Sequence, residues 1–153
     1  MIHVSIKDEF VSLVSEQNLI QVATNVLNNQ KIALSDVELT IVISDDLELQ
    51  NLNRQYLQVD APTDVLSFPI NETNPETGRK YLGDVIISYQ TSLQQSLNAG
   101  HPVTDEIQLL VVHGVLHLLG YDHIDQEDKH KMWVTQKEIL EQLGCHIAII
   151  ADE

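Results

Sequence analysis

The feature that most constrains the fold of this 153-residue chain is an almost unbroken apolar run from Ile107 to Leu119. Thr104 is expected to cap a helix here, with carboxylates in the first turn, where the positive end of a helix favours them. Because apolar residues lie on most sides of this helix, we expect it to be buried at the centre of the molecule. Gly120 is placed to end it.

The other segments show strand and helix patterns that do not strictly alternate. Alternating apolar residues predict strands, and apolar residues at helical spacing predict helices. The strands are expected over residues 2–6, 37–43, 65–70 and 82–88, and the remaining helices over 15–29, 44–57 with Ser44 as cap, 89–98 before Gly100, and 126–143. Residues 71–78 are expected to form a long hairpin loop or flap, and residues 146–150 a short extension. The fold class is therefore α+β, a single domain over residues 1–153 with a small mixed sheet of about four strands and about five helices.

Composition indicates which partners and which cellular compartment the protein can have. The chain has 8 Lys+Arg against 23 Asp+Glu, a net charge of −15, which argues against a broad surface that coats RNA or binds DNA. No apolar run reaches the roughly 18 residues of a membrane span, and no secretory signal is visible. One cysteine, Cys145, excludes an internal disulfide, fits a reducing compartment and is expected to be a small buried residue. We therefore expect a cytoplasmic protein with neither membrane nor DNA as a partner.

Three histidines, His113, His117 and His123, fall within eleven residues at the end of the central helix. Four helical steps leave the first two rings about 40° apart and about 6 Å along the axis, so both can face one ion. Gly120 lets the chain turn back and bring His123 to the same place. A pair of histidines four residues apart occurs by chance on many helices, but the third histidine after a glycine favours metal binding. Three neutral nitrogens with an open fourth position are typical of a catalytic zinc site, so we expect one Zn²⁺ per chain.

The spacing H-x-x-x-H-x-x-G-x-x-H matches the long metalloprotease signature except at one position. That signature has Glu after the first histidine as the general base, and here the residue is Gly114. Without a side chain at this position, an ordinary peptidase mechanism is disfavoured unless a carboxylate from elsewhere replaces it.

The segment HGVLHLLGYDH resembles the signature of the YbeY-type family of single-strand-specific, metal-dependent endoribonucleases. Two further segments are similar: residues 62–69 (PTDVLSFP), preceded by Leu52, Asn53 and Tyr56, and residues 82–88 (LGDVIIS). The resemblance covers most of the chain, from about Val37 to Leu143.

The resemblance implies an α+β fold with a zinc site at a helix end, with His113, His117 and His123 as the zinc ligands. It also implies cleavage of single-stranded RNA, maturation of the 3′ end of small-subunit ribosomal RNA, and a role in ribosome quality control. The implied partners are ribosomal RNA, ribosomal subunits and proteins such as ribosomal proteins or GTPases. Family members usually carry Arg directly after the tyrosine, where this chain has Leu57; Arg54, one helical turn earlier, is the candidate replacement.

In the expected mechanism, zinc-activated water attacks a phosphodiester bond, because zinc lowers the pKa of bound water towards roughly 7. Asp122 could move protons, but orienting a histidine ring is the favoured role. Asp64 and Thr63 are expected either to line the cleft or to cap a turn, and Tyr121 to pack rather than to stack on a base. Two alternatives stay open: a metal-dependent hydrolase of another substrate such as a peptide, and a ribosome-associated factor in which zinc is mainly structural.

Overall fold

The computed structural model describes residues 1–145 and 147. The extension expected over residues 146–150 therefore lies, apart from Ile147, outside the described residues. In chain order the elements are β1 (Ile2–Ile6), α1 (Glu16–Asn29), β2 (Val37–Ser44), α2 (Asp46–Leu57), β3 (Val65–Thr73), β4 (Lys80–Ser88), α3 (Tyr89–Ala99), α4 (Val103–Leu118) and α5 (Gln126–Gln142), with single-turn 3-10 helices at Asp8–Phe10 and Leu34–Asp36. No helix among the described residues is both long enough and apolar enough to cross a membrane.

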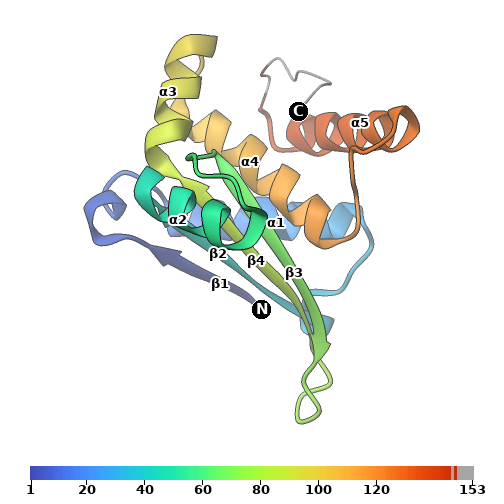
Figure 1. Ribbon diagram of the computed structural model, residues 1–153. Helices are drawn as coiled ribbons and strands as arrows, with labels where there is room; N and C mark the ends of the chain where they lie inside the picture. Colours follow the sequence, from blue (N-terminus) through green and yellow to red (C-terminus); the bar gives the residue numbers. More distant parts are fainter. Residues whose placement is uncertain (146, 148–153) are drawn as a thin grey trace.

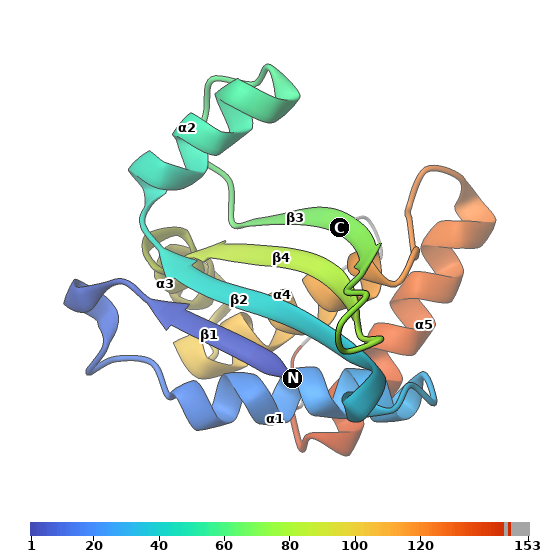
Figure 2. The ribbon, with the colours of Figure 1, turned by 90° about the horizontal axis from the view of Figure 1, so that it is seen from below.

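The four strands form one mixed sheet in the order β1-β2-β4-β3. Strand β2 pairs in parallel with β1 and with β4, whereas β3 is antiparallel to β4. Helices α1 and α4 cover one face of the sheet and α2 lies against the other (Figures 1 and 2). This arrangement confirms the predicted α+β class, the mixed four-stranded sheet and the five helices of the described part of the chain.

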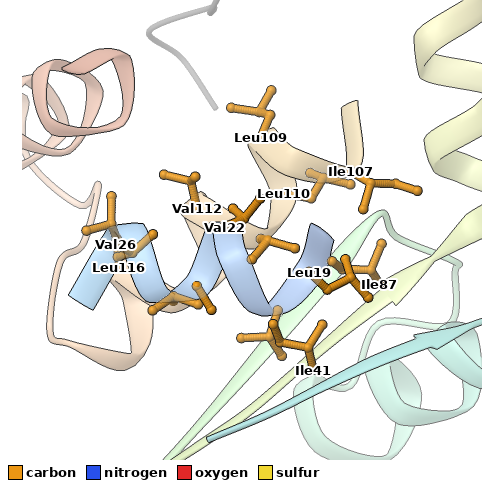
Figure 3. Packing of buried hydrophobic residues seen from close by; sticks show 14 of the residues in the cluster. Leu19, Val22, Val26, Ile41, Ile87, Ile107, Leu109, Leu110, Val112 and Leu116 are labelled. Atoms are coloured by element: carbon orange, nitrogen blue, oxygen red, sulfur yellow. The ribbon is translucent and has the colours of Figure 1, made fainter. Parts of the chain in front are cut away.

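The main core lies between the sheet and the pair α1 and α4 (Figure 3). Val22 of α1, Ile41 of β2 and Leu116 of α4 are fully buried there. Helix α4 packs against α1, α3, α5, β3 and β4, which confirms its predicted central position. Cys145 is also buried in this core, as predicted, and burial raises the pKa of its thiol to about 11. A second, smaller cluster of Leu49, Leu66 and Ile86 fills the space beneath α2.

The two predicted helix caps, Ser44 and Thr104, are both wrong. Asp45 is the N-cap of α2, and its Oδ1 accepts a hydrogen bond of 2.9 Å from the backbone N–H of Glu48. Ser44 is instead the last residue of β2 and is buried, and among the described residues its Oγ has no hydrogen-bond partner. Helix α4 starts one residue before Thr104, directly after the extended Pro102, so Thr104 lies inside the first turn. Competing polar and proline neighbours decide these boundaries, and the sequence alone does not rank them.

The hairpin between β3 and β4 is longer, and its loop shorter, than predicted. Strand β3 continues to Thr73 and β4 begins at Lys80, so six residues, 74–79, connect them. The pairing is irregular between Pro69 and Glu72 and then resumes, because proline cannot donate to the ladder and Asn71 adopts a positive φ of 55°. The hairpin extends beyond the rest of the sheet (Figure 1).

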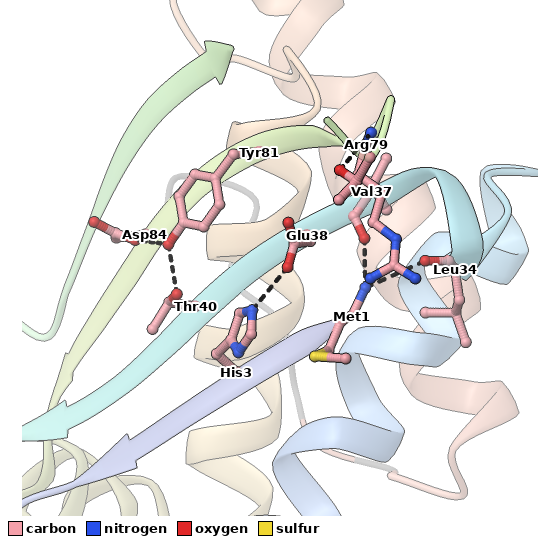
Figure 4. A network of polar contacts seen from close by, with 10 residues as sticks. Met1, His3, Leu34, Val37, Glu38, Thr40, Arg79, Tyr81 and Asp84 are labelled. Carbon is pink, nitrogen blue, oxygen red and sulfur yellow. Dashed lines mark hydrogen bonds and ion pairs between the residues drawn. The ribbon is translucent and has the colours of Figure 1, made fainter. Parts of the chain in front are cut away.

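The sheet face opposite α1 and α4 carries a polar network beyond the part that α2 covers (Figure 4). The hydroxyl oxygen of Tyr81 lies 2.5 Å from Thr40 Oγ1 and 2.5 Å from Asp84 Oδ1. Burial, together with the bond to Asp84, raises the pKa of the Tyr81 phenol. On the neighbouring strand, His3 Nε2 lies 3.0 Å from Glu38 Oε1. These contacts join β1, β2 and β4 and stabilise the sheet, whose opposite face packs against α4.

Candidate metal centre

The rings of His113, His117 and His123 lie together at the carboxyl end of α4. One ligand atom from each ring can be chosen so that all three lie within 4.8 Å of one another. His113 Nε2 and His117 Nε2 are 3.0 Å apart, and the ring centre of His123 lies 5.8 Å and 5.1 Å from those of His113 and His117. The juxtaposition predicted from the spacing is therefore present.

A tight turn after α4 brings the third histidine to the first two. The N–H of Gly120 donates to the carbonyl of His117 at 3.0 Å, and the N–H of Tyr121 donates to the carbonyl of Leu116 at 3.0 Å. Gly120 has a φ of +100°, a conformation that side chains of L-residues rarely adopt. The glycine thus lets the chain reverse, and His123 returns to the helix end.

The hydrogen bonds of the two helical histidines fix which nitrogen carries the proton. His117 Nδ1 lies 2.8 Å from the carbonyl oxygen of Tyr121, and a carbonyl only accepts, so Nδ1 carries the hydrogen. His113 Nδ1 likewise lies 2.7 Å from Oε1 of Gln136, a buried side chain of α5. In the neutral rings both Nε2 atoms then present lone pairs to each other at 3.0 Å. Two such lone pairs repel unless a cation lies beside them, so the donor set fits a metal ion.

Burial favours the neutral form of the His113 and His117 rings, which is the form that binds metals. Burial, followed by the charge of neighbouring His117, lowers the pKa of His113 to about 4. Burial, followed by the charge of His123, also lowers the pKa of His117. Because only the neutral imidazole coordinates a metal, these two rings need no deprotonation at neutral pH.

The histidines open into a cleft of about 620 Å³ between α4 and β3. Its lining comprises Leu57, Asp64, Val65, Leu66, Ser67, Pro69, Leu109, Leu110, His113, His117, Gly120, Tyr121, Asp122 and His123. Asp64 fulfils both of its predicted roles, since it lines the cleft and its Oδ1 accepts the backbone N–H of Val65 at 2.7 Å. Thr63 is not part of the lining; its hydroxyl donates to Asp64 at 3.4 Å.

Asp122 lies in the cleft wall, but its contact differs from the expected one. Its Oδ1 accepts the backbone N–H of His123 at 2.7 Å, so the carboxylate shapes the turn that presents this histidine. The carbonyl of Tyr121 and the side chain of Gln136 hold the other two rings. Tyr121 packs, as expected, with its hydroxyl donating to Gln30 at 2.9 Å.

The two α2 residues that the resemblance singles out lie in different surroundings. Leu57 is part of the cleft lining. Arg54 is exposed outside that lining, where it donates to Asn51 at 3.0 Å and pairs with Asp60 at 3.9 Å. The structure therefore places a leucine, and not Arg54, in the wall of the cleft.

Gly114 faces the sheet and not the cleft. A Cβ at this position would lie 2.5 Å from Val85 Cγ1 and 3.2 Å from Ser67 Oγ. The Ser67 hydroxyl donates to the Gly114 carbonyl at 3.0 Å, so helix and strand are in direct contact here. Close packing of α4 on the sheet thus requires glycine where the peptidase signature has its general base.

Gln136 is the residue that sequence reasoning missed. It is 3% exposed, which is unusual for a glutamine, and it lies on the same face of α5 as Met132, Ile139 and Leu140. A glutamine inside an apolar stripe opposite a histidine helix is a signal for a buried hydrogen bond, although its partner depends on how α5 packs.

The comparisons with known proteins agree with this geometry. The family model described as Endoribonuclease YbeY matches residues 3–144. A relative named Endoribonuclease YbeY from Oceanobacillus iheyensis is 39% identical over 150 residues, covering 93% of this chain and 97% of the relative. Another from Corynebacterium diphtheriae is 40% identical over 143 residues, covering 88% of this chain and 72% of the relative.

A solved structure supports the fold independently. The solution structure of TM1509 from Thermotoga maritima superposes with a TM-score of 0.63 at 24% identity, covering 94% of this chain and 89% of that protein. The three-histidine cluster, the glycine turn and the family match over nearly the whole chain lead to one conclusion: this chain belongs to the YbeY endoribonuclease family.

Proposed function

We propose that this protein is a zinc-dependent, single-strand-specific endoribonuclease that acts in the maturation of the small-subunit ribosomal RNA 3′ end and in ribosome quality control. The observation that carries the proposal is the pair of unprotonated Nε2 atoms 3.0 Å apart, with His123 beside them, in a cleft of a chain from this family. One zinc ion per chain, held by His113, His117 and His123, would complete the site. Ribosomal RNA and ribosomal subunits in the cytoplasm are the proposed partners.

A zinc ion bound there would activate water and stabilise negative charge on a phosphate. The chain contributes the orientation of the ligands, because Gln136 and the Tyr121 carbonyl fix two rings and Asp122 fixes the turn that carries His123. The hydrogen bonds at Nδ1 keep the His113 and His117 rings in one tautomer, with their Nε2 atoms 3.0 Å apart and free to bind an ion.

The size and lining of the cleft support an unpaired substrate. Its volume of about 620 Å³ is that of a small-molecule site, which suits an unpaired nucleotide better than a duplex. The cleft has an apolar wall that can contact the face of a base, formed by Leu57, Leu109, Leu110 and Pro69. Arg54 is the proposed phosphate contact from α2, which requires it to leave its exposed partners Asn51 and Asp60.

A peptidase is the weaker alternative, because the base position of the peptidase signature faces the sheet at Gly114. A purely structural zinc is also a weaker alternative. Structural zinc sites usually fill all four positions with protein ligands, and within the described part of the chain this cluster has three.

The test is cleavage of a labelled single-stranded RNA that carries the 3′ end of small-subunit ribosomal RNA. We expect cleavage by the wild type, none in the presence of a chelator, and none by His113→Ala. A duplex of the same sequence should be spared. Cleavage of casein instead of RNA would replace the proposal with the peptidase. Co-sedimentation with ribosomes by both wild type and His113→Ala, without RNA cleavage by either, would replace it with the ribosome-associated factor.

A further inference from the structure

Strand β3 forms one edge of the sheet, and the direction of its free backbone groups follows from its register. The N–H of Ser88 donates to the carbonyl of Asp64 at 2.9 Å, and Val65 is paired with Ile87. In an antiparallel ladder, hydrogen-bonded and non-hydrogen-bonded pairs alternate, so the N–H and C=O groups of Val65 and Ser67 point away from β4. Asp64 Oδ1 already accepts the Val65 N–H, whereas the Ser67 N–H is directed to the open side.

This free edge is also a wall of the cleft. Val65, Ser67 and Pro69 are lining residues together with the metal-site histidines. Among the described strands, none pairs with the outer side of β3. Pro69 has no N–H and the Val65 N–H is bound to Asp64, so a strand added to this edge would pair with the carbonyl of Val65 and with both backbone groups of Ser67.

The side chains that line the cleft carry negative charge, which disfavours RNA binding. Among its described lining residues there are two carboxylates, Asp64 and Asp122, and no Lys or Arg. The sequence from Gln55 to Gly78 contains β3, the loop before it and the loop after it except for its last residue, Arg79. This stretch has no Lys or Arg but has four acidic residues: Asp60, Asp64, Glu72 and Glu76. A phosphodiester chain needs cations at its binding site, and neutralisation of phosphates dominates RNA affinity.

We propose that the β3 edge binds an extended, Lys/Arg-rich polypeptide segment of a partner protein, which pairs with the backbone of Ser67 beside the metal centre. The pairing is β-strand addition, in which main-chain hydrogen bonds supply affinity and alternate side chains supply specificity. Side chains of the added strand meet the carboxylates of the cleft. Their cations then supply phosphate-binding charge that the described lining of the cleft lacks. This effect rests on the proposed ribonuclease function.

The chemistry of the edge favours a polypeptide over an RNA strand as its occupant. Ser67 offers an N–H and a C=O to the same side, the pair that an extended peptide backbone matches. The neighbouring Asp64 carboxylate repels a phosphate and attracts an ammonium or guanidinium group.

The binding test compares Ser67→Pro with Ser67→Ala, using the full chain. Ser67→Pro removes the outward N–H, which β4 does not use, and Ser67→Ala keeps that N–H while losing the same hydroxyl contact to Gly114. The probe is a fluorescein-labelled nonapeptide of alternating Lys and Thr, measured by anisotropy, with a Glu and Thr peptide as charge control. We expect Ser67→Pro to bind the basic peptide about tenfold more weakly than Ser67→Ala, and the acidic peptide to bind neither.

Hydrogen exchange of the wild type gives a readout that needs no variant. The basic peptide should slow exchange of the Ser67 amide, and a single-stranded RNA should not. Equal binding by the two variants, binding of the acidic peptide, or protection of Ser67 by RNA alone would each overturn the proposal.

A second assay separates this proposal from the ribonuclease. The basic peptide should stimulate RNA cleavage by Ser67→Ala more than by Ser67→Pro. If RNA is not cleaved under any condition but the peptide still protects Ser67, the ribonuclease fails and the docking edge stands. If RNA is cleaved but the peptide neither binds nor stimulates, the docking edge fails and the ribonuclease stands.

Discussion

At the scale of single residues, the proposed metal site depends on side chains that hold the histidine rings as well as on the histidines themselves. Gln136 accepts the Nδ1 hydrogen of His113 at 2.7 Å. Replacing Gln136 with Ala should lower zinc affinity by roughly 10- to 100-fold, because the ring loses its orienting partner. Competition with a chromophoric chelator measures this affinity.

The matched control for that change is Gln136→Glu, which keeps an acceptor oxygen at the same reach. It should retain most of the zinc affinity that Gln136→Ala loses. Equal affinities in the wild type and Gln136→Ala would show that Gln136 does not position His113.

Gly114 gives a second residue-scale prediction, on stability. Alanine normally stabilises a helix relative to glycine, by roughly 1 kcal/mol. Here Gly114→Ala should instead destabilise the protein by about 1–3 kcal/mol, since its Cβ would lie 2.5 Å from Val85 Cγ1. Urea denaturation measures the free energy of unfolding.

The companion variant for Gly114→Ala is Val85→Ala, alone and combined. The double variant should lose less unfolding free energy than the sum of the two single variants, because Val85→Ala removes the methyl groups that the new Cβ of Gly114→Ala would contact. A strictly additive cost, or a more stable Gly114→Ala protein, would contradict the packing described for α4 on β4.

At this scale the sequence predicted what lies in one short segment and missed what depends on packing. His113 and His117 lie one helical turn apart on α4, and His123 follows directly after the turn at Gly120. Their spacing was therefore enough to predict that the three rings lie together. Gln136 comes from another helix, 23 residues away, and reaches His113 only because α5 packs across α4. The contact of Asp122 with the His123 N–H also depends on the local turn, which spacing does not specify.

At the scale of elements, the start of α2 carries a pH-dependent contribution to stability. Asp45 caps the helix and lies 2.9 Å from Lys7 Nζ, and Lys7, followed by the Glu48 N–H, lowers the pKa of the Asp45 carboxyl below its usual 3.8. Asp45→Ala should cost about 1 kcal/mol at neutral pH, the usual cost of a lost N-cap. Asp45→Asn keeps the cap acceptor and should cost less.

The pH dependence of Asp45 has a definite sign. A carboxyl whose pKa is lower in the folded than in the unfolded protein stabilises the fold above the unfolded pKa and loses this effect as the pH falls through the folded pKa. The stability difference between wild type and Asp45→Asn should therefore be constant near pH 7 and shrink below pH 3.8. Thermal denaturation across this range measures it, and a difference that grows on acidification would contradict the ion pair.

The elements themselves were largely predictable, and their ends were not. Apolar periodicity identified the four strands and five α-helices of the described residues, because burial sets that pattern directly. The first residue of α2 and the length of the β3–β4 hairpin depended on competition between neighbouring caps and on pairing past Pro69, which periodicity does not register.

At the scale of the whole molecule, a net charge of −15 and a proposed RNA substrate coexist because the charges are separated along the chain. No Lys or Arg occurs from Tyr81 to Asp128, the span that contains the metal-site histidines. In the proposed function, positive charge at the cleft would come from the ion held by the three histidines, from Arg54 and from a partner strand on β3. This charge distribution could be read from the sequence. That β3 is the edge strand beside the cleft could not, because it follows from the sheet order β1-β2-β4-β3.

The proposed ribonuclease activity depends on a metal ion held by the three histidines. The most direct measurement is the rate of single-stranded RNA cleavage while zinc is added stepwise to protein freed of metal. We expect the rate to rise in proportion to bound zinc and to level off at about one ion per chain. The rate of His117→Ala should not change as zinc is added. Cleavage that does not depend on added metal, or that persists in His117→Ala, would contradict the proposed activity.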